Sequence, residues 1–208
     1  MESNTSKTFI SSPKSQNMVK STSKMIVALG SNQRSVAGGP DSTILGAARA
    51  LQAHGALIRK RSQLYQTPCF PAGAGPDYVN AALLIEAHWS PAEALAHLHD
   101  IEHEFGRERI KRWGQRTLDL DLIAMDDVVA PDLPTYEVWR DLEPELQTTR
   151  APTELILPHP RLQDRAFVLV PMADVASDWV HPVSGLSVSQ MLAVIPAHEK
   201  AEVIPLNQ

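Results

Sequence analysis

The chain has 208 residues, of which 43% are hydrophobic and 21% are charged, and its formal net charge is -5. This length suits one good hydrophobic core and is too short for two large ones. The negative charge gives no general attraction to nucleic acid or to an anionic membrane, so a bound polyanion needs a local cluster of basic residues.

The expected location follows from what the chain lacks. No stretch approaches the roughly 18 consecutive apolar residues that a membrane-spanning helix needs, and no apolar signal core follows the basic residues near the start. The single cysteine, Cys69, cannot form an intramolecular disulfide, which fits a reducing compartment. We therefore expect a cytoplasmic protein.

The first residues differ in composition from the rest of the chain. Residues 1–23 are rich in Ser, Lys, Thr and Asn and have only scattered apolar side chains. Such a segment cannot bury enough surface to offset its ordering entropy. We expect a disordered tail over 1–23 and a single domain over 24–208.

A strand and a helix are the first elements expected in the domain. Residues 25–29 form a short apolar run that ends at a Gly-Ser-Asn turn, which is typical of a buried strand. Asp41 or Ser42 is expected to cap the following helix, whose apolar residues recur at helical spacing, and Gly55 to end it. This helix is expected to cover a sheet face.

Two strands and a second helix come next. Residues 57–65 and 78–87 have the composition of strands, and the Pro- and Gly-rich segment 67–76 between them is expected to be a loop. Ser90, Pro91 and Glu93 combine an N-cap, a first-turn proline and a capping-box glutamate, which predicts a helix. Residues 116–124 then alternate, with leucines on one side and Asp119 and Asp121 on the other. This pattern predicts a strand with one acidic face.

The remaining segments complete a mixed pattern. Residues 126–157 are polar and punctuated by proline, with a short helix expected over 136–146, and residues 165–176 are expected to form another helix. The extended segment 126–157 either packs on the core or forms a dimer contact. Strands and helices in this order favour an α+β fold, ferredoxin-like, with a largely antiparallel sheet covered by helices.

The acidic strand is the first candidate for chemistry. Asp119 and Asp121 are two residues apart, so both carboxylates project from the same face, where they could share one or two magnesium ions. The alternative is that the pair only decorates a solvated sheet face, because antiparallel sheets often have a wet side.

A basic run lies just before this strand. Five cations stand within ten residues, against the single acid Glu108: Arg107, Arg109, Lys111, Arg112 and Arg116. Guanidinium groups suit phosphate oxygens, although a basic run is more often a solvated loop, and Arg107 could simply neutralise a helix C-terminus. Phosphoryl transfer relies on metal ions and arginines to neutralise phosphate charge. The two clusters together therefore favour a nucleotide-phosphate site.

Two other kinds of site have less support. His97, His99 and His103 invite a zinc site, but no metalloprotease motif with its glutamate accompanies them, and we do not expect zinc. The chain has neither a P-loop nor a kinase-type glycine loop, so a nucleotide site must be of another kind.

The segment that joins the two clusters closely resembles a family signature. Residues 112–122 read Arg-Trp-Gly-Gln-Arg-Thr-Leu-Asp-Leu-Asp-Leu. They resemble the 6-hydroxymethyl-7,8-dihydropterin pyrophosphokinase family, which usually has proline where Gln115 stands. Other segments resemble the family in the same order: 28–32, 65–68, 78–80, 101–109 and 158–167. The resemblance extends over residues 25–176.

The resemblance implies a step of folate synthesis. A pyrophosphoryl group would move from ATP to the hydroxymethyl oxygen of the pterin, which attacks the β-phosphorus while AMP leaves. Two magnesium ions are expected, with ATP as co-substrate.

The resemblance also assigns roles to individual residues. The residues expected to be catalytic are Arg107, Arg116, Asp119 and Asp121, and the two aspartates would hold the metal ions. Those expected to bind ATP are Glu102, Arg109, Arg112, Trp113, Leu122, His159 and Arg165, with His99 as a further polar contact. Those expected to bind the pterin are Thr67, Pro68, Phe70, Tyr78, Asn80, Trp113, Asp119 and Phe167, with the ring between Tyr78 and Phe167. Isolated aromatics and asparagines more often have structural roles, and the family motif outweighs that interpretation.

Some positions depart from the family pattern. Gln115 replaces proline, Pro160 stands where an aromatic residue can follow the histidine, and the segment 121–159 is longer than is typical. The loops 70–76 and 107–113 are expected to be mobile without ligand and to close over substrates, which excludes water.

Two rival functions share part of these features. A non-catalytic nucleotide- or RNA-binding domain would use the basic run for phosphates and Tyr78, Trp113 and Phe167 for stacking, although the adjacent aspartates count against it. A transferase acting on another small acceptor would need the same carboxylates and arginines. We expect small-molecule substrates, no nucleic acid, no membrane, and either a monomer or a homodimer.

Overall fold

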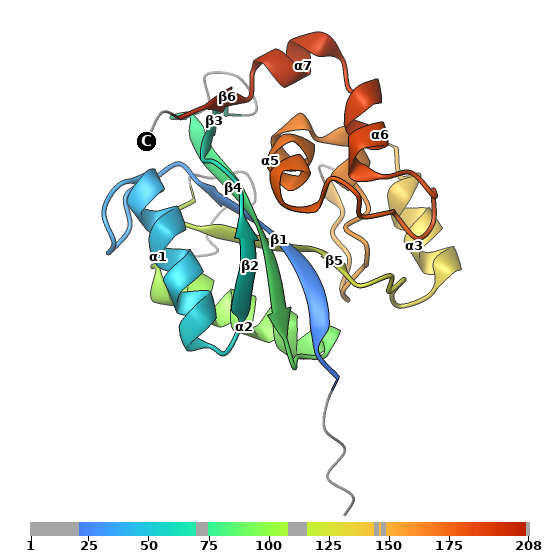
Figure 1. The fold of residues 1–208 in the computed structure, drawn as a ribbon, viewed down its shortest axis with the longest axis horizontal. Helices are drawn as coiled ribbons and strands as arrows, with labels where there is room; N and C mark the ends of the chain where they lie inside the picture. The colour runs from blue at the N-terminus through green and yellow to red at the C-terminus, as the bar shows by residue number, and fades with distance from the viewer. Residues whose placement is uncertain (1–20, 70–74, 108–115, 144–145, 147–148, 207–208) are drawn as a thin grey trace, which may run out of the picture.

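An antiparallel sheet forms the centre of the molecule. The computed structural model describes residues 21–69, 75–107, 116–143, 146 and 149–206, and within them the sheet has six strands (Figure 1). They are β1 (Ser23–Ser31), β2 (Leu57–Arg61), β3 (Tyr65–Thr67), β4 (Tyr78–Ala87), β5 (Asp119–Met125) and β6 (Ile204–Pro205). β1 begins at the last residue of the expected tail, most of which lies outside the described residues.

The strand order is that of a split β-α-β repeat. β1 pairs with β4 on one side and with β5 on the other, while β2 and β3 both pair with β4, and β6 pairs with β3. The helix α1 (Pro40–Ala53) joins β1 to β2, and α2 (Pro91–Glu104) joins β4 to β5. This arrangement is ferredoxin-like and α+β, as the sequence predicted.

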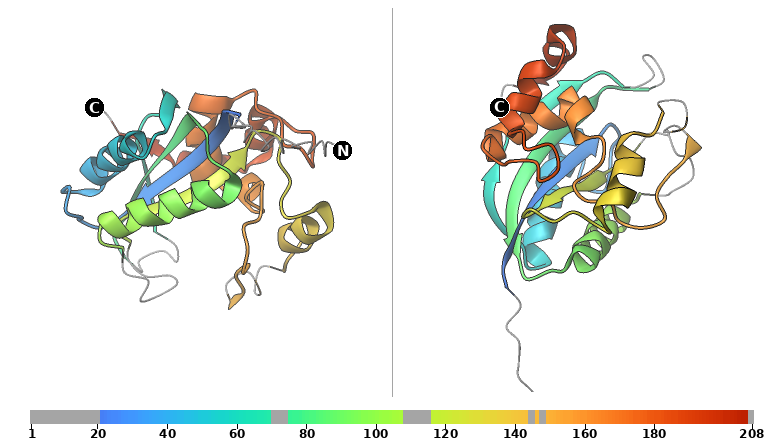
Figure 2. Two further views of the ribbon diagram at one scale, coloured as in Figure 1. Left: turned by 90° about the horizontal axis from the view of Figure 1, so that it is seen from below. Right: turned by 90° about the vertical axis from the view of Figure 1, so that its right-hand side faces the viewer.

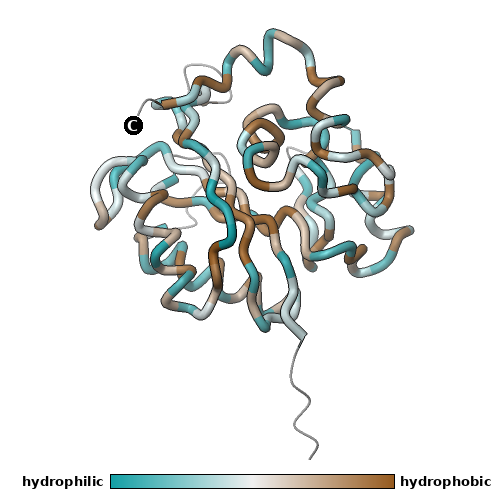
Figure 3. The backbone as a smooth tube through the Cα atoms, viewed as in Figure 1, coloured by the Kyte–Doolittle hydropathy of each residue, from teal (hydrophilic) through white to brown (hydrophobic). Residues whose placement is uncertain are grey.

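Helices cover both faces of the sheet (Figure 2). α1 and α2 pack on one face, over a core that includes Val27, Leu83 and Leu122. α5 (Ala166–Ala176) and α6 (Val188–Val194) pack on the other face, over Ile26 and Ile123. Hydrophobic residues are concentrated along the central strands and α5 (Figure 3). Within the described ranges, none of the helices is both long and apolar enough to cross a membrane.

The helix ends follow local sequence signals. The predicted capping box of α2 is confirmed, because the Ser90 side chain accepts from the Glu93 N–H and the Glu93 side chain accepts from the Ser90 N–H. The predicted cap of α1 is wrong: the N-cap is Gly39, because Pro40 already occupies the first turn. Gly55, at φ +99°, follows the end of α1 as predicted.

Strand boundaries differ from the prediction in two places. The expected strand over 57–65 is divided into β2 and β3, because the Ser62 N–H donates to the Ala82 carbonyl while the Ser62 Oγ accepts from the Ala82 N–H. The expected strand over 116–124 begins only at Asp119. Arg116 is instead hydrogen-bonded to Asn32, the residue after β1.

The helix of the extended segment 126–157 packs against the rest of the domain. Its helix, α3 (Leu133–Arg140), starts earlier than expected because the Asp132 side chain caps it at the Thr135 N–H. Tyr136 is fully buried, and its hydroxyl lies 3.0 Å from Nε2 of His181. Of the alternatives left open by the sequence, core packing therefore applies to α3.

The C-terminal part contains elements that the sequence reasoning missed. They are η1 (Leu162–Asp164), α6, α7 (Ala197–Ala201) and β6. The signal for α6 was present in the sequence, because Ser187 and Gln190 form a capping box like that of α2.

Candidate active site

The acidic face of β5 continues across the sheet. Gly30 of β1 lies opposite Asp119 of β5 on one side and opposite Asn80 of β4 on the other. Because paired residues in an antiparallel sheet point to the same face, these side chains share one surface. Asp121 lies in the next row, opposite Ala28. The leucines of β5 are buried on the other face, so the predicted alternation is confirmed.

Gly30 has no side chain, which leaves space above the backbone in the middle of this surface. A Cβ atom at Gly30 would lie 3.2 Å from Oδ1 of Asn80, 3.8 Å from the Tyr78 ring and 3.9 Å from Cβ of Asp119. Three candidate side chains from two neighbouring strands therefore surround one glycine. Sequence reasoning assigned this glycine only to a turn.

Asp119 is held by two arginines. Nη1 of Arg107 lies 2.7 Å from one carboxylate oxygen, and Nη1 of Arg116 contacts the other. Burial raises the pKa of Asp119, and the nearby charge of Asp121 raises it further, whereas the two arginines oppose the shift. Two carboxylates this close together favour a bound cation.

Glu102 of α2 contacts both the start of β5 and one of these arginines. Its side chain is buried on α2, accepts from the Leu120 N–H at 2.8 Å and contacts Arg107. Burial raises the pKa of Glu102 to about 7, although the Leu120 hydrogen bond and Arg107 oppose the shift. Glu102 thus joins α2, the start of β5 and the arginine that holds Asp119.

Asn32 positions Arg116, a contact that sequence reasoning missed. Its Oδ1 accepts from the Arg116 N–H at 2.9 Å, and its own N–H donates to the Arg116 carbonyl at 3.1 Å. Its Nδ2 donates to the Pro76 carbonyl at 3.1 Å. Asn32 is 5% exposed, so these bonds are shielded from water. A Gly-Ser-Asn turn gives no hint of such distant partners.

Four of the residues expected to bind the pterin lie on β3, β4 and α5, namely Thr67, Tyr78, Asn80 and Phe167. Asn80 is buried and donates from Nδ2 to the Thr67 hydroxyl at 2.7 Å, and Tyr78 is half-buried beside it. Pro68 is exposed. Phe167 is 42% exposed, at the start of α5, and the Arg165 guanidinium lies 5.6 Å from its ring centre.

The segment with His159 is fixed to the outer edge of β5. The pairing of β1 with β5 is irregular between Ile26 and Val27, which leaves Ile123 as the extra residue of a β-bulge. The His159 N–H donates to the Ile123 carbonyl at 2.8 Å. Burial lowers the pKa of His159 to about 3, and the charges of Arg165 and Arg161 lower it further. His159 is therefore neutral.

The remaining expected site residues separate into two groups. The Leu122 side chain lies in the core beneath α1 and α2, away from the acidic surface. Phe70, Arg109, Arg112 and Trp113 lie outside the described residues, as do Gln115 and most of the two loops expected to be mobile.

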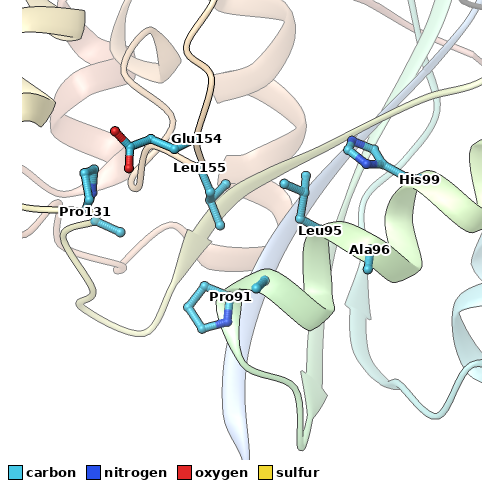
Figure 4. A pocket seen from close by; sticks show the side chains of 9 residues that line it. Pro91, Leu95, Ala96, His99, Pro131, Glu154 and Leu155 are labelled. Atoms are coloured by element: carbon cyan, nitrogen blue, oxygen red, sulfur yellow. The ribbon is translucent and has the colours of Figure 1, made fainter.

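A pocket opens along α2 (Figure 4). It lies between α2 and the segments at 130–131 and 154–155, and its volume is about 470 Å³. Its lining is mainly apolar, with Leu95 and Leu155 on facing sides and His99 and Glu154 at its edge. His99, at the edge of the pocket, is one turn of α2 before Glu102. Glu102 in turn contacts Arg107.

The residues fit magnesium in part. Among the described residues, no group of three or more His, Cys, Asp or Glu side chains is arranged to hold a metal ion. Magnesium is usually held by one or two carboxylates together with substrate phosphates and water. Asp119 and Asp121 match that mode of binding.

Fold and site together define an α+β protein with a split β-α-β sheet and a carboxylate-arginine site on one face. Residues 26–177 match the family described as 7,8-dihydro-6-hydroxymethylpterin-pyrophosphokinase (HPPK). The chain belongs to this family, as its sequence signature predicted.

Several known proteins are similar to this chain in sequence. A 2-amino-4-hydroxy-6-hydroxymethyldihydropteridine pyrophosphokinase of Synechocystis is 38% identical over 138 residues, which cover 66% of this chain and 60% of that protein. The corresponding enzyme of Haemophilus influenzae is 31% identical, with 86% of this chain and 97% of that protein covered. The folic acid synthesis protein fol1 of Pneumocystis carinii is 29% identical over 92% of this chain, which spans only 23% of that protein.

A solved structure has the same fold. The wild-type HPPK-DHPS crystal structure of Plasmodium falciparum has a TM-score of 0.58, with 85% of this chain and 45% of that chain covered. At 13% sequence identity, this likeness concerns the fold alone.

Proposed function

We propose that this protein transfers a pyrophosphoryl group from ATP to 6-hydroxymethyl-7,8-dihydropterin, a step of folate synthesis, and releases AMP. The observation that carries the proposal is that Arg107 and Arg116 both contact Asp119, next to Asp121 on one sheet face. Carboxylates for metal and arginines for phosphate are the groups that phosphoryl transfer requires. ATP is the co-substrate of enzymes in this family.

The reaction is a displacement at the β-phosphorus. The hydroxymethyl oxygen bonds to that phosphorus and releases its proton to solvent, while the bond from the phosphorus to the oxygen bridging it to the α-phosphate breaks, and AMP leaves with that oxygen. Arg107 and Arg116 stabilise the negative charge of the transferring group. Two magnesium ions, held by Asp119 and Asp121, would neutralise phosphate charge and orient the triphosphate of ATP.

The acceptor is proposed to lie over Gly30. The absence of a side chain there leaves room for a flat ring, and the Asn80 and Thr67 pair offers hydrogen-bonding groups at one edge. Tyr78 and Phe167 are proposed to contact the ring faces. The hydroxymethyl group would then point toward Asp119.

The nucleotide is proposed to extend from the pocket to the acidic surface. Leu95 and Leu155 give the pocket apolar walls that suit a nucleobase. Glu102, His159 and Arg165 are proposed to contact the nucleotide between that pocket and the acidic surface. Leu122 would contribute through its backbone, because its side chain is buried on the other face.

A single domain over 24–208 is supported by the C-terminal strand. β6 pairs with β3, so the last described element belongs to the same sheet as the first. The protein is proposed to act in the cytoplasm as a monomer or a homodimer.

The test is acceptor-dependent AMP formation. ATP and magnesium are incubated with and without 6-hydroxymethyl-7,8-dihydropterin, and AMP is separated from ADP by chromatography. Acceptor-dependent AMP is expected. ADP alone would indicate a different phosphotransferase, and RNA binding without turnover would indicate the binding domain.

Two variants sharpen this test. Asp119→Asn removes a metal ligand with little change in shape and is expected to lower turnover by at least about a thousandfold. Asp100→Asn, on the exposed side of α2, removes the same charge away from the site and is the matched control. Asp119→Asn turnover near that of the control would contradict the proposed role.

A further inference from the structure

Arg161 has no role in the proposed reaction, yet in the sequence it lies between His159 and Arg165, which both have one. Its own N–H donates to Nδ1 of His159 at 3.2 Å, and the Leu162 N–H donates to the His159 carbonyl at 3.1 Å. His159 is in turn bonded to the bulge of β5. The backbone of Arg161 is therefore held at a fixed place next to the acidic strand.

The guanidinium of Arg161 has an unused donor. Its Nε atom is buried and has no hydrogen-bond partner among the described residues. A buried donor without a partner is rare in native proteins and destabilises the fold. One explanation for such a group is that a ligand supplies the missing acceptor.

Three basic side chains meet at this place. Nδ1 of His159 accepts the Arg161 N–H, so the proton of this neutral ring is on Nε2 and is available to donate. Burial lowers the pKa of Arg165, and the charge of Arg161 contributes to that shift. The charges of Asp119 and Asp121 also act on Arg165, and that of Asp119 acts on His159, so these two residues lie near the acidic pair.

We propose that Arg161 binds a phosphate group of the nucleotide beyond the α-phosphate, with its Nε–H donating to a phosphate oxygen. This inference rests on the proposed function, because the ligand is the polyphosphate of ATP. A guanidinium matches phosphate geometry with several donors at once. Because the contact is beyond the α-phosphate, Arg161 favours ATP over the product AMP.

Binding measurements with three ligands test the assignment. Titration calorimetry in the presence of magnesium would compare ATP, inorganic tripolyphosphate and AMP. Arg161→Gln is expected to weaken ATP and tripolyphosphate roughly ten- to a hundredfold, as for the loss of a hydrogen bond between charged groups, and to leave AMP within about twofold. Arg161→Lys keeps the charge without the fork and should recover part of the affinity.

The matched control is Arg49→Gln. Arg49 is exposed on α1, on the opposite side of the sheet, so this variant loses the same charge and is expected to bind all three ligands as the wild type does. The melting temperature of the ligand-free protein is a second measurement. A structural role for Arg161 would lower it in Arg161→Gln, whereas removal of an unsatisfied donor leaves it unchanged or raises it.

Unchanged ATP affinity in Arg161→Gln would overturn the inference, as would an equal loss for ATP and AMP. Failure of the proposed function is a separate result. In that case the wild type forms no acceptor-dependent AMP, while Arg161→Gln still loses tripolyphosphate affinity.

Discussion

Substitution of Gly30 by alanine tests the proposed acceptor surface most directly. The new Cβ atom would lie 3.2 Å from Oδ1 of Asn80, which is closer than most real Cβ contacts. Gly30 is in the central strand, which pairs on both sides, so its backbone cannot move away easily. Asn80 has to shift instead, and its 2.7 Å bond to the Thr67 hydroxyl is strained or lost.

The expected effect can be worked from that bond. A hydrogen bond of this kind contributes about 0.5–1.5 kcal/mol, and each 1.4 kcal/mol is about tenfold in affinity. We therefore expect Gly30→Ala to weaken pterin binding about two- to tenfold. Calorimetric titration with the pterin and with Mg-ATP measures the two sites separately, and ATP affinity should remain within about twofold.

A matched control is available on the other face. Gly46→Ala in α1 would place a Cβ 2.9 Å from the Phe105 ring, so it introduces the same methyl group with similar crowding. It should change stability and leave pterin affinity unchanged. Pterin binding by Gly30→Ala equal to that of Gly46→Ala would refute the placement of the acceptor over Gly30.

Three further perturbations probe the surroundings of the site. Asn32→Ala removes the side-chain acceptor of the Arg116 N–H and should lower the turnover number about tenfold, measured as AMP formation with all substrates saturating. Because burial raises the pKa of Glu102 in the folded state from 4.5 to about 7, the folded state binds this proton more tightly, and the unfolding free energy should fall as pH rises through that interval. Glu102→Gln should remove that part of the pH dependence in urea unfolding. Tyr136→Phe removes the partner of Nε2 of His181 and should cost about 1–2 kcal/mol of stability, with AMP formation unchanged.

The sequence was sufficient for features that depend on local patterns. Alternation over 118–122 predicted the acidic face of β5, and the spacing of Ser90 and Glu93 predicted the start of α2. Both depend on side chains a few residues apart, whose relative directions are set by the period of a strand or a helix. The family signature extended these patterns to a candidate site.

Long-range pairing could not be read from the same patterns. The contact between Asn32 and Arg116 joins segments 84 positions apart, and it depends on the register of β1 against β5. The bulge at Ile123 is a second example, because no residue type requires it there, yet it leaves a carbonyl free for His159. The role of Gly30 likewise appears only when β4 and β5 are placed on either side of it.

That placement also explains how one surface could serve two substrates. Neighbouring strands are about 4.8 Å apart, so Asp119 and Asn80, on either side of β1, are separated by about two strand spacings, or roughly 10 Å. His159, proposed for the nucleotide, is on the β5 side, and Asn80 and Thr67, proposed for the acceptor, are on the β4 side. Roughly 10 Å is close to the span of a bicyclic ring with a hydroxymethyl arm. A ring hydrogen-bonded at Asn80 and lying over Gly30 would therefore bring its hydroxyl to the phosphates at Asp119 without movement of the sheet.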